Sequence, residues 1–149
     1  MAFDPRFGIE IPFVGLLGFQ LEHCQDGASE LHYLPQAEHL NSFQVTHGGA
    51  CMTLLDVAMA TAARSTEPGM GAVTIEMKTS FMRPSQGLLV ARGRLLHRTA
   101  TLAFTEASIH DAEGQLCAHA TGTFKLVRRL PVGGKATQGL QPLPPGQPG

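Results

Sequence analysis

A single carboxylate, Asp56, lies in a helical stretch that is otherwise uncharged. From Ala50 to Ala63 all the other residues are Ala, Cys, Met, Thr, Leu or Val, which predicts a helix buried nearly all round. Burying a charge is costly unless the group is paired or hydrogen-bonded. Asp56 therefore has two interpretations: a structural acceptor of hydrogen bonds from the backbone or an Arg, or an acid/base group in a cleft.

The pair Gly48-Gly49 introduces this helix. Unpaired N–H groups at a helix start attract negative charge, so the N–H of Gly49 could hold an oxyanion, although such a pair is also common turn chemistry. Gly49 and Asp56 are seven residues apart, or about 10 Å along a helix axis. One carbonyl cannot touch both in one chain. If both act on it, a two-fold dimer with antiparallel helices must bring them together.

Strand-like segments surround the helix. Two lie around the turn 25–27, and after 67–69 the apolar period changes from 3.6 to 2. Short connections favour antiparallel pairing in a sheet wrapped round the helix, which is an α+β fold. Segment 9–17 is expected to form a short helix or an apolar lid. The expected strands are 18–24, 28–33, a strand from 73 that runs into 81–84, 88–97, 100–110 and 115–128.

Length and composition bound the organisation of the chain. With 149 residues and 43% hydrophobic content, one domain is the simplest interpretation, and we assign it to residues 1–130. From Pro131 the chain turns to Gly, Pro, Gln and Lys without apolar periodicity. Residues 131–149 are therefore expected to form a flexible tail.

Charge and cysteine usage disfavour several functional classes. The net charge is −1 and Trp is absent, which argues against a nucleic-acid partner. No apolar run approaches the ~20 residues of a membrane helix, and the start lacks a leader pattern, so we expect a cytoplasmic protein without a membrane partner. Cys24, Cys51 and Cys117 lie far apart, which indicates neither a zinc site nor a disulfide set. Reduced, buried thiols are the default expectation.

The order Asn41, His47-Gly48-Gly49 and Asp56, followed by the strand VTIEMKTSFMRP, resembles the hotdog-fold acyl-CoA thioesterases of the PaaI-like and 4-hydroxybenzoyl-CoA thioesterase superfamily. The resemblance spans roughly residues 10–128. It implies the hotdog fold, a homodimer with a continuous sheet that often forms a dimer of dimers, and hydrolysis of acyl-CoA thioesters without metal or cofactor.

The resemblance also implies roles for particular residues. Asp56 would be the general base or nucleophile, and Gly49 or Gly48 the oxyanion donor. Asn41 would position the attacking water or the thioester. Thr74 supplies a hydroxyl where family members carry Ser. In this family the Asn and Gly come from one subunit, and the Asp and hydroxyl from the other.

Further candidates concern substrate binding. His47 is expected to support the turn or the thioester pocket, while the carboxylate does the chemistry. Arg92, Arg94 and Arg98 are evenly spaced on one face of a strand, where they either meet phosphates or form a solvated face. The candidates for substrate contact are His47, Gly48, Met52 and Phe81, with Arg83, Arg92 and Arg94 for the coenzyme A phosphates. Other apolar residues that could line the acyl pocket or belong to the core are Phe13, Leu16, Leu17, Met59, Met77 and Met82.

Two other functions use the same fold. One is an enoyl-CoA hydratase or dehydratase, although its His-containing motif is absent. The other is a non-catalytic module that binds acyl-CoA, which the joint presence of Asn41, Gly49, Asp56 and Thr74 disfavours.

Overall fold

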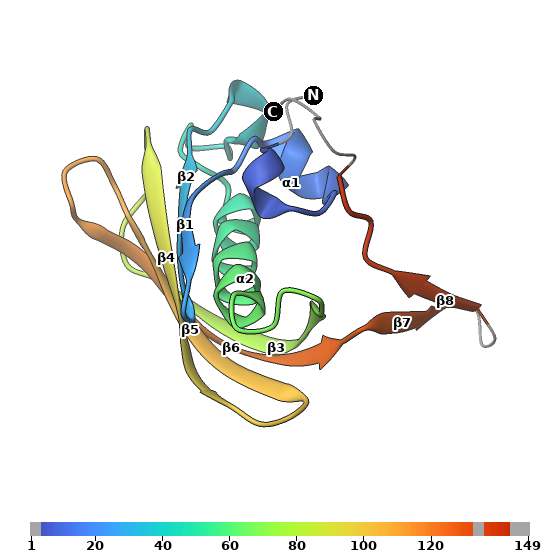
Figure 1. The fold of residues 1–149 in the computed structure, drawn as a ribbon. Helices are drawn as coiled ribbons and strands as arrows, with labels where there is room; N and C mark the ends of the chain where they lie inside the picture. The colour runs from blue at the N-terminus through green and yellow to red at the C-terminus, as the bar shows by residue number, and fades with distance from the viewer. Residues whose placement is uncertain (1–3, 133–135, 144–149) are drawn as a thin grey trace.

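The protein folds as one antiparallel sheet wrapped around one long helix (Figure 1). The computed structural model describes residues 4–132 and 136–143. The sheet has the order β1-β2-β4-β5-β6-β3, and every neighbouring pair is antiparallel. The predicted hotdog fold, with two strands, one helix and then four strands, is confirmed. The bounds are β1 Gln20–Gln25, β2 Ala28–Tyr33, α2 Gly48–Arg64, β3 Gly71–Phe81, β4 Leu89–Arg98, β5 Leu102–His110 and β6 Leu116–Val127.

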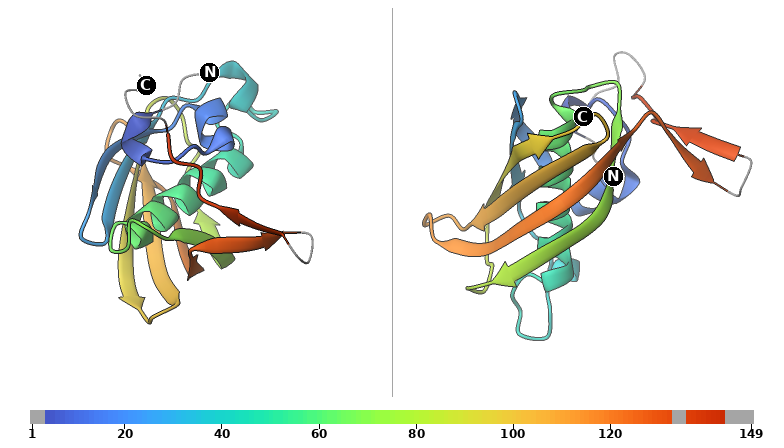
Figure 2. Two further views of the ribbon diagram at one scale, coloured as in Figure 1. Left: turned by 45° about the vertical axis from the view of Figure 1, so that its right-hand side comes forward. Right: turned by 90° about the horizontal axis from the view of Figure 1, so that it is seen from below.

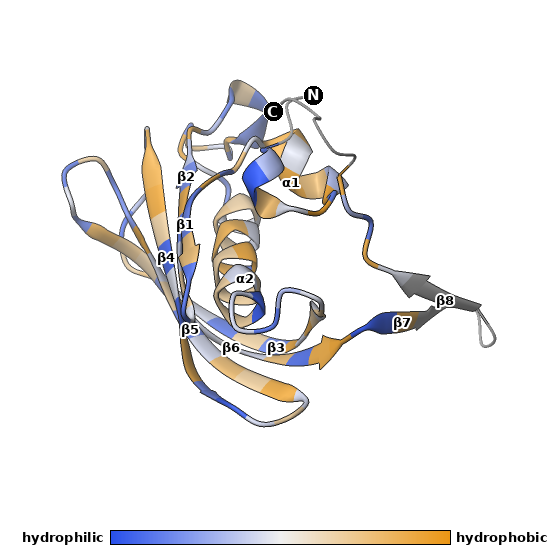
Figure 3. Ribbon diagram, viewed as in Figure 1, coloured by the Kyte–Doolittle hydropathy of each residue, from blue (hydrophilic) through white to orange (hydrophobic). Residues whose placement is uncertain are grey.

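Small residues let α2 lie close against the inner face of the sheet (Figure 2). At Gly93 an added Cβ would be 2.3 Å from the carbonyl oxygen of Ala58, so only glycine fits where β4 passes the helix. The hydroxyl of Ser29 donates to that same carbonyl at 2.7 Å. The core around this contact is apolar on both sides, as the colouring of α2 in Figure 3 shows.

One side of α2 is not covered, so the prediction of a helix buried nearly all round is wrong for that side. Gly49 and Met52 are exposed, and Asp56 and Ala60 are partly exposed. Their spacing of three, four and four residues places them along one side of α2. We call these four residues the open stripe. Composition could not reveal it, because Met and Ala suit a core equally well.

The two edges of the sheet differ. At the β1 edge, the N–H of Leu21 donates to the Asp4 carboxylate at 2.7 Å, so the N-terminal segment covers part of this edge. At the other edge, no strand within the described residues pairs with the outer side of β3. Apolar side chains lie along this open edge strand, where Ile75 is 55% and Phe81 52% exposed.

Short helices precede and follow the first hairpin. The segment expected as a helix or lid contains α1, Pro12–Leu17. Phe13 and Leu16 are exposed on it and Leu17 is buried. Two 3-10 helices, Pro5–Phe7 and Ala37–His39, complete the described helices. Within the described residues, no helix is long and apolar enough to cross a lipid bilayer.

Part of the segment predicted as a flexible tail is paired in the structure. Strands β7, Arg129–Val132, and β8, Ala136–Gly139, form an antiparallel hairpin that extends away from the sheet (Figures 1 and 2). The chain then returns toward α1, where the N–H of Glu10 donates to the carbonyl of Gln141 at 2.7 Å. Residues 133–135 and 144–149 lie outside the described residues, and the domain boundary at 130 remains a prediction.

Candidate active site

Asp56 lies on the open stripe beside the start of the edge strand. The hydroxyl of Thr74 on β3 donates to Asp56 Oδ1 at 2.6 Å. Burial raises the pKa of Asp56 above the usual value for a carboxyl, and the hydrogen bond from Thr74 opposes that rise. A partly buried carboxylate with a higher pKa and one fixed hydroxyl partner has the properties of a general base.

A cavity of about 340 Å³ opens beside this carboxylate. The helix contributes Asp56, Val57, Ala60 and Arg64 to its wall, and the start of β3 forms the opposite wall. Residues from both chain ends close the remaining sides, namely Ile9, Glu10, Ile11, Leu130, Gly139 and Leu140. The wall is mostly apolar next to the carboxylate, which is typical of a pocket for an apolar substrate group.

His47 is the N-cap of α2. Its Nδ1 accepts the N–H of Gly49 at 2.8 Å, and its carbonyl accepts the N–H groups of Ala50 and Cys51. Nδ1 must be unprotonated to accept this bond, so the ring proton lies on Nε2. The structure thus gives His47 a place in the turn, and it gives the N–H of Gly49 an internal partner that any oxyanion would have to replace.

Asn41 organises the loop before the helix. Its Oδ1 accepts the N–H of Phe43 at 2.8 Å and that of Val45 at 3.3 Å. These two donors occupy the oxygen and leave the amide N–H groups to donate. Asn41 can therefore donate a hydrogen bond to a carbonyl or sulfur.

A second cavity, of about 410 Å³, brings several predicted residues together. Asn41, Gly48, Phe81 and Arg83 all line it. Asp56 and Thr74 are not among its lining residues: Asp56 lines the first cavity, and Thr74 and Gly49 line neither. Gly49 and Asp56 are seven positions apart in α2, or about 10 Å along its axis.

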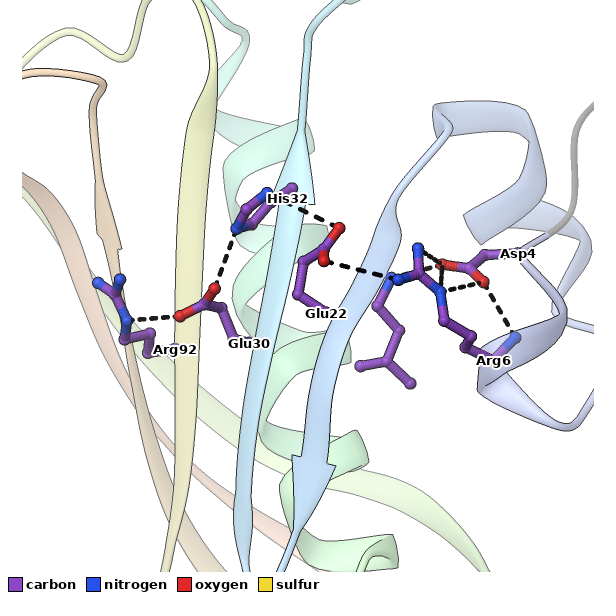
Figure 4. A network of polar contacts seen from close by, with 7 residues as sticks. Asp4, Arg6, Glu22, Glu30, His32 and Arg92 are labelled. Carbon is purple, nitrogen blue, oxygen red and sulfur yellow. Dashed lines mark hydrogen bonds and ion pairs between the residues drawn. The ribbon is translucent and has the colours of Figure 1, made fainter.

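The structure does not bring Arg92 and Arg94 to either of these cavities. Arg92 pairs with Glu30 at 2.9 Å in a chain of contacts that continues through His32 and Glu22 to Arg6 (Figure 4). Arg94 pairs with Glu106. These pairs lie on the face of the sheet away from α2, where both arginines line a third cavity of about 350 Å³. Phosphate contact by Arg92 and Arg94 stays a prediction.

The remaining apolar candidates divide between core and surface. Met59 is fully buried, and the core explains it without a substrate. Met52 is 38% exposed on the open stripe, and Met82 lines the cavity with Asn41. Phe13 and Leu16 are exposed and line neither cavity.

Sequence reasoning missed the C-terminal residues that close the cavity at Asp56, such as Leu130 and Leu140. Ile9 and Ile11, which also line it, belong to the segment expected as a short helix or an apolar lid. The only sequence signal for these contacts was the presence of apolar residues, such as Leu140, among the Gly and Pro of the last segment. Nothing local indicates what they contact.

The cysteines are free thiols, and two of them are buried. Cys51 lies in the first turn of α2, where burial raises its pKa, so the thiol stays protonated and unreactive. Cys117 is also buried, and Cys24 is exposed. The expectation of buried thiols is thus wrong for Cys24.

Among the described residues, no group of three or more His, Cys, Asp or Glu side chains is arranged to hold a metal ion.

Comparison with known proteins identifies the family. The model of the thioesterase superfamily matches residues 43–118, a range that includes Gly49, Asp56 and Thr74. Human acyl-coenzyme A thioesterase 13 is 32% identical over 94 residues, which are 61% of this chain and 67% of that protein. A protein of Saccharolobus solfataricus, provisionally named as an esterase, is 33% identical over 56% of this chain. The match spans 61% of that relative's length.

A solved structure agrees with the sequence matches. The phenylacetic acid degradation-related protein from Ralstonia eutropha superposes with a TM-score of 0.73 at 29% identity. The match covers 81% of this chain and 95% of that one. The chain therefore belongs to the thioesterase superfamily, a family of hotdog-fold thioester hydrolases.

Proposed function

We propose that the protein hydrolyses acyl-CoA thioesters to a free acid and coenzyme A, at sites shared between two subunits. The observation that carries the proposal is the position of the Asp56–Thr74 pair. Asp56 lies on the open stripe of α2. This stripe begins at Gly49, and the described part of the chain leaves it partly uncovered. Family membership supplies the reaction class, and this geometry supplies the candidate residues.

The open stripe and the edge of β3 support a dimer. Exposed apolar groups near an unpaired strand edge favour association, and Met52, Ile75 and Phe81 are such groups. A two-fold axis beside β3 would extend the sheet and set the two helices antiparallel. Asp56 would then face Gly49 of the partner subunit, and two equivalent sites would form.

The proposed chemistry starts from the thioester carbonyl. The N–H of Gly49 or Gly48 in one subunit, with the amide of Asn41, would polarise the carbonyl oxygen. At Gly49 the substrate oxygen would replace His47 Nδ1 as the acceptor. Arg83 lines the same cavity as Asn41 and would pair with phosphate groups of coenzyme A.

Asp56 of the other subunit would complete the reaction. Acting as a base, it takes a proton from water, the hydroxide adds to the carbonyl carbon, and the C–S bond breaks. The proton then passes to the departing thiolate. Acting as a nucleophile, its carboxylate adds to the carbonyl carbon, the C–S bond breaks and coenzyme A thiolate leaves, and water then hydrolyses the mixed anhydride to the free acid and the Asp56 carboxylate. Thr74 holds the carboxylate in position in either route.

The experiment is a panel of aliphatic and aryl acyl-CoA substrates, assayed for thiol release. Because Cys24 is exposed, a protein-only blank corrects for its reaction with the thiol reagent. Release from saturated acyl-CoA is expected. Turnover of enoyl-CoA alone would indicate the hydratase, and binding without release would indicate the non-catalytic module.

Location and higher assembly belong to the same proposal. We place the protein in the cytoplasm because its three thiols are free, which suits a reducing compartment. A dimer of dimers is expected from the family resemblance.

A further inference from the structure

The cavity beside Asp56 is closed by residues from the C-terminal end of the chain. We call residues 139–143, at the end of β8 and beyond it, the C-terminal strap. Gly139 and Leu140 of the strap line the cavity opposite the helix. Leu140 lies against the start of β3, where a Cβ added to Gly71 would be 2.9 Å from Leu140 Cδ2. Leu140, which is partly buried, therefore contacts the sheet where the strap meets it.

Two contacts hold the strap to the N-terminal segment. The N–H of Glu10 donates to the carbonyl of Gln141 at 2.7 Å, and Ile9 forms an antiparallel bridge with Pro142. Figure 1 shows the chain returning from β8 to the region of α1 along this path. The strap lies beyond residues 43–118, which the superfamily model matches.

The proposed reaction implies how an acyl-CoA substrate would be oriented in this cavity. The thioester carbonyl would lie at Asp56, and coenzyme A would extend through the cavity of the partner subunit that contains Asn41 and Arg83. The acyl chain then has the other direction available, past Val57 and Ala60 toward Arg64. Asp56 and Arg64 are eight residues apart, about 12 Å along the helix.

We propose that the C-terminal strap, through Leu140, closes the acyl pocket and sets the length of acyl chain that the enzyme accepts. This inference rests on the proposed thioesterase function. The wall is mostly apolar, although Arg64, Arg128 and Arg129 also line the cavity, and Leu140 lines it together with the start of β3. A change in the volume of this one side chain should change the pocket without touching Asp56, Thr74 or the helix start.

The test compares Leu140→Ala and Leu140→Trp with the wild type on saturated acyl-CoA substrates of increasing length. The smaller side chain should move the optimum of kcat/KM to longer chains, and the larger one to shorter chains. Each methylene that the enlarged pocket buries should raise kcat/KM about fourfold. Leu34→Ala, at an exposed loop residue that lines neither cavity, is the matched control and should keep the wild-type profile. An unchanged profile in both Leu140 variants, with unchanged thermal unfolding, would overturn the proposal.

A binding measurement separates this proposal from the proposed function. Calorimetric titration with free fatty acids of the same lengths reports the pocket without any turnover. If the longest fatty acid that binds depends on residue 140, the role of the strap in closing the pocket is supported even when no thioester is cleaved. In that case only the thioesterase assignment fails. If thioesters are cleaved but neither kcat/KM nor fatty-acid binding depends on residue 140, the strap does not close the acyl pocket.

Discussion

Burial of Asp56 disfavours its ionised form. Because burial raises its pKa, the folded chain binds this proton more tightly than the unfolded chain does. The stabilising contribution is complete below about pH 3.9, the ordinary Asp value, and is lost as pH rises through the higher folded pKa. Asp56→Asn removes the charge, and its Oδ1 can still accept the hydroxyl of Thr74.

We predict that Asp56→Asn lowers kcat/KM for acyl-CoA by roughly two orders of magnitude or more and raises the melting temperature at neutral pH. The difference in melting temperature should vanish near pH 3. Thiol-release assays and thermal unfolding at several pH values measure both effects. Activity within a few-fold of wild type would remove Asp56 from the mechanism.

The hydroxyl of Thr74 gives a second prediction, because it lowers the pKa of Asp56. A base works only when ionised, so activity falls as pH drops through that pKa. Thr74→Val should move this acidic limb to higher pH and lower kcat by about tenfold, the scale of a hydrogen bond to a charged group. Thr74→Ser keeps the hydroxyl and should keep the wild-type profile. Identical pH profiles for Val and Ser would contradict this role.

His47 is assigned to the helix cap and not to the chemistry. His47→Ala should lower the free energy of unfolding by about 1 kcal/mol and keep kcat/KM within about tenfold of wild type. His47→Asn, which replaces the ring with a good capping side chain, should recover most of the stability. A hundredfold loss of activity in both variants, with the fold intact, would make His47 the base instead.

At the scale of elements, local patterns predicted most of the fold. The alternation in β3 to β6 and the Gly-Gly start of α2 are local signals, and the structure has those elements. The β7–β8 hairpin was missed, since its segment shows no alternation. The segment after this hairpin is held by Glu10–Gln141 and Ile9–Pro142 contacts, which join opposite ends of the chain. No local pattern encodes such contacts.

The same limit applies to the site. Position in the motif brought Asp56 and Thr74 forward as candidates, and they are hydrogen-bonded. The Asn41 and Gly48 group lines one cavity with Arg83. The partners of Arg92 and Arg94 were not predictable. Glu30 and Glu106 lie opposite them only because of the register between neighbouring strands, which the sequence does not state.

The open stripe of α2 gives a prediction for this element. In the proposed dimer, Met52 packs against the partner helix, whereas in one chain it is exposed. Met52→Glu should therefore leave the protomer folded but shift it toward monomers, because charges at an apolar interface must lose their water. Light scattering after size-exclusion chromatography measures the mass. Leu96→Glu, at another exposed apolar residue, should remain dimeric. An unaltered mass for Met52→Glu would place the interface elsewhere.

At the scale of the whole molecule, we propose that one protomer contains two halves of a site that do not meet. Asp56, which accepts the hydroxyl of Thr74, lines one cavity, and Asn41 and Gly48 line another. Two copies related by a two-fold axis would join the halves twice. Activity would then depend on protein concentration near the dissociation constant of the dimer.

Complementation between two inactive variants tests this arrangement most directly. Asn41→Ala and Asp56→Asn each damage both sites of their own homodimer, but a mixed dimer has one intact site and one site with both defects. Equal amounts of the two chains, refolded together, should recover about a quarter of wild-type thiol release, because half of the dimers are mixed and each has one of two sites. Activity no greater than the mean of the two separate variants, in a sample shown to contain mixed dimers, would contradict a site shared between subunits.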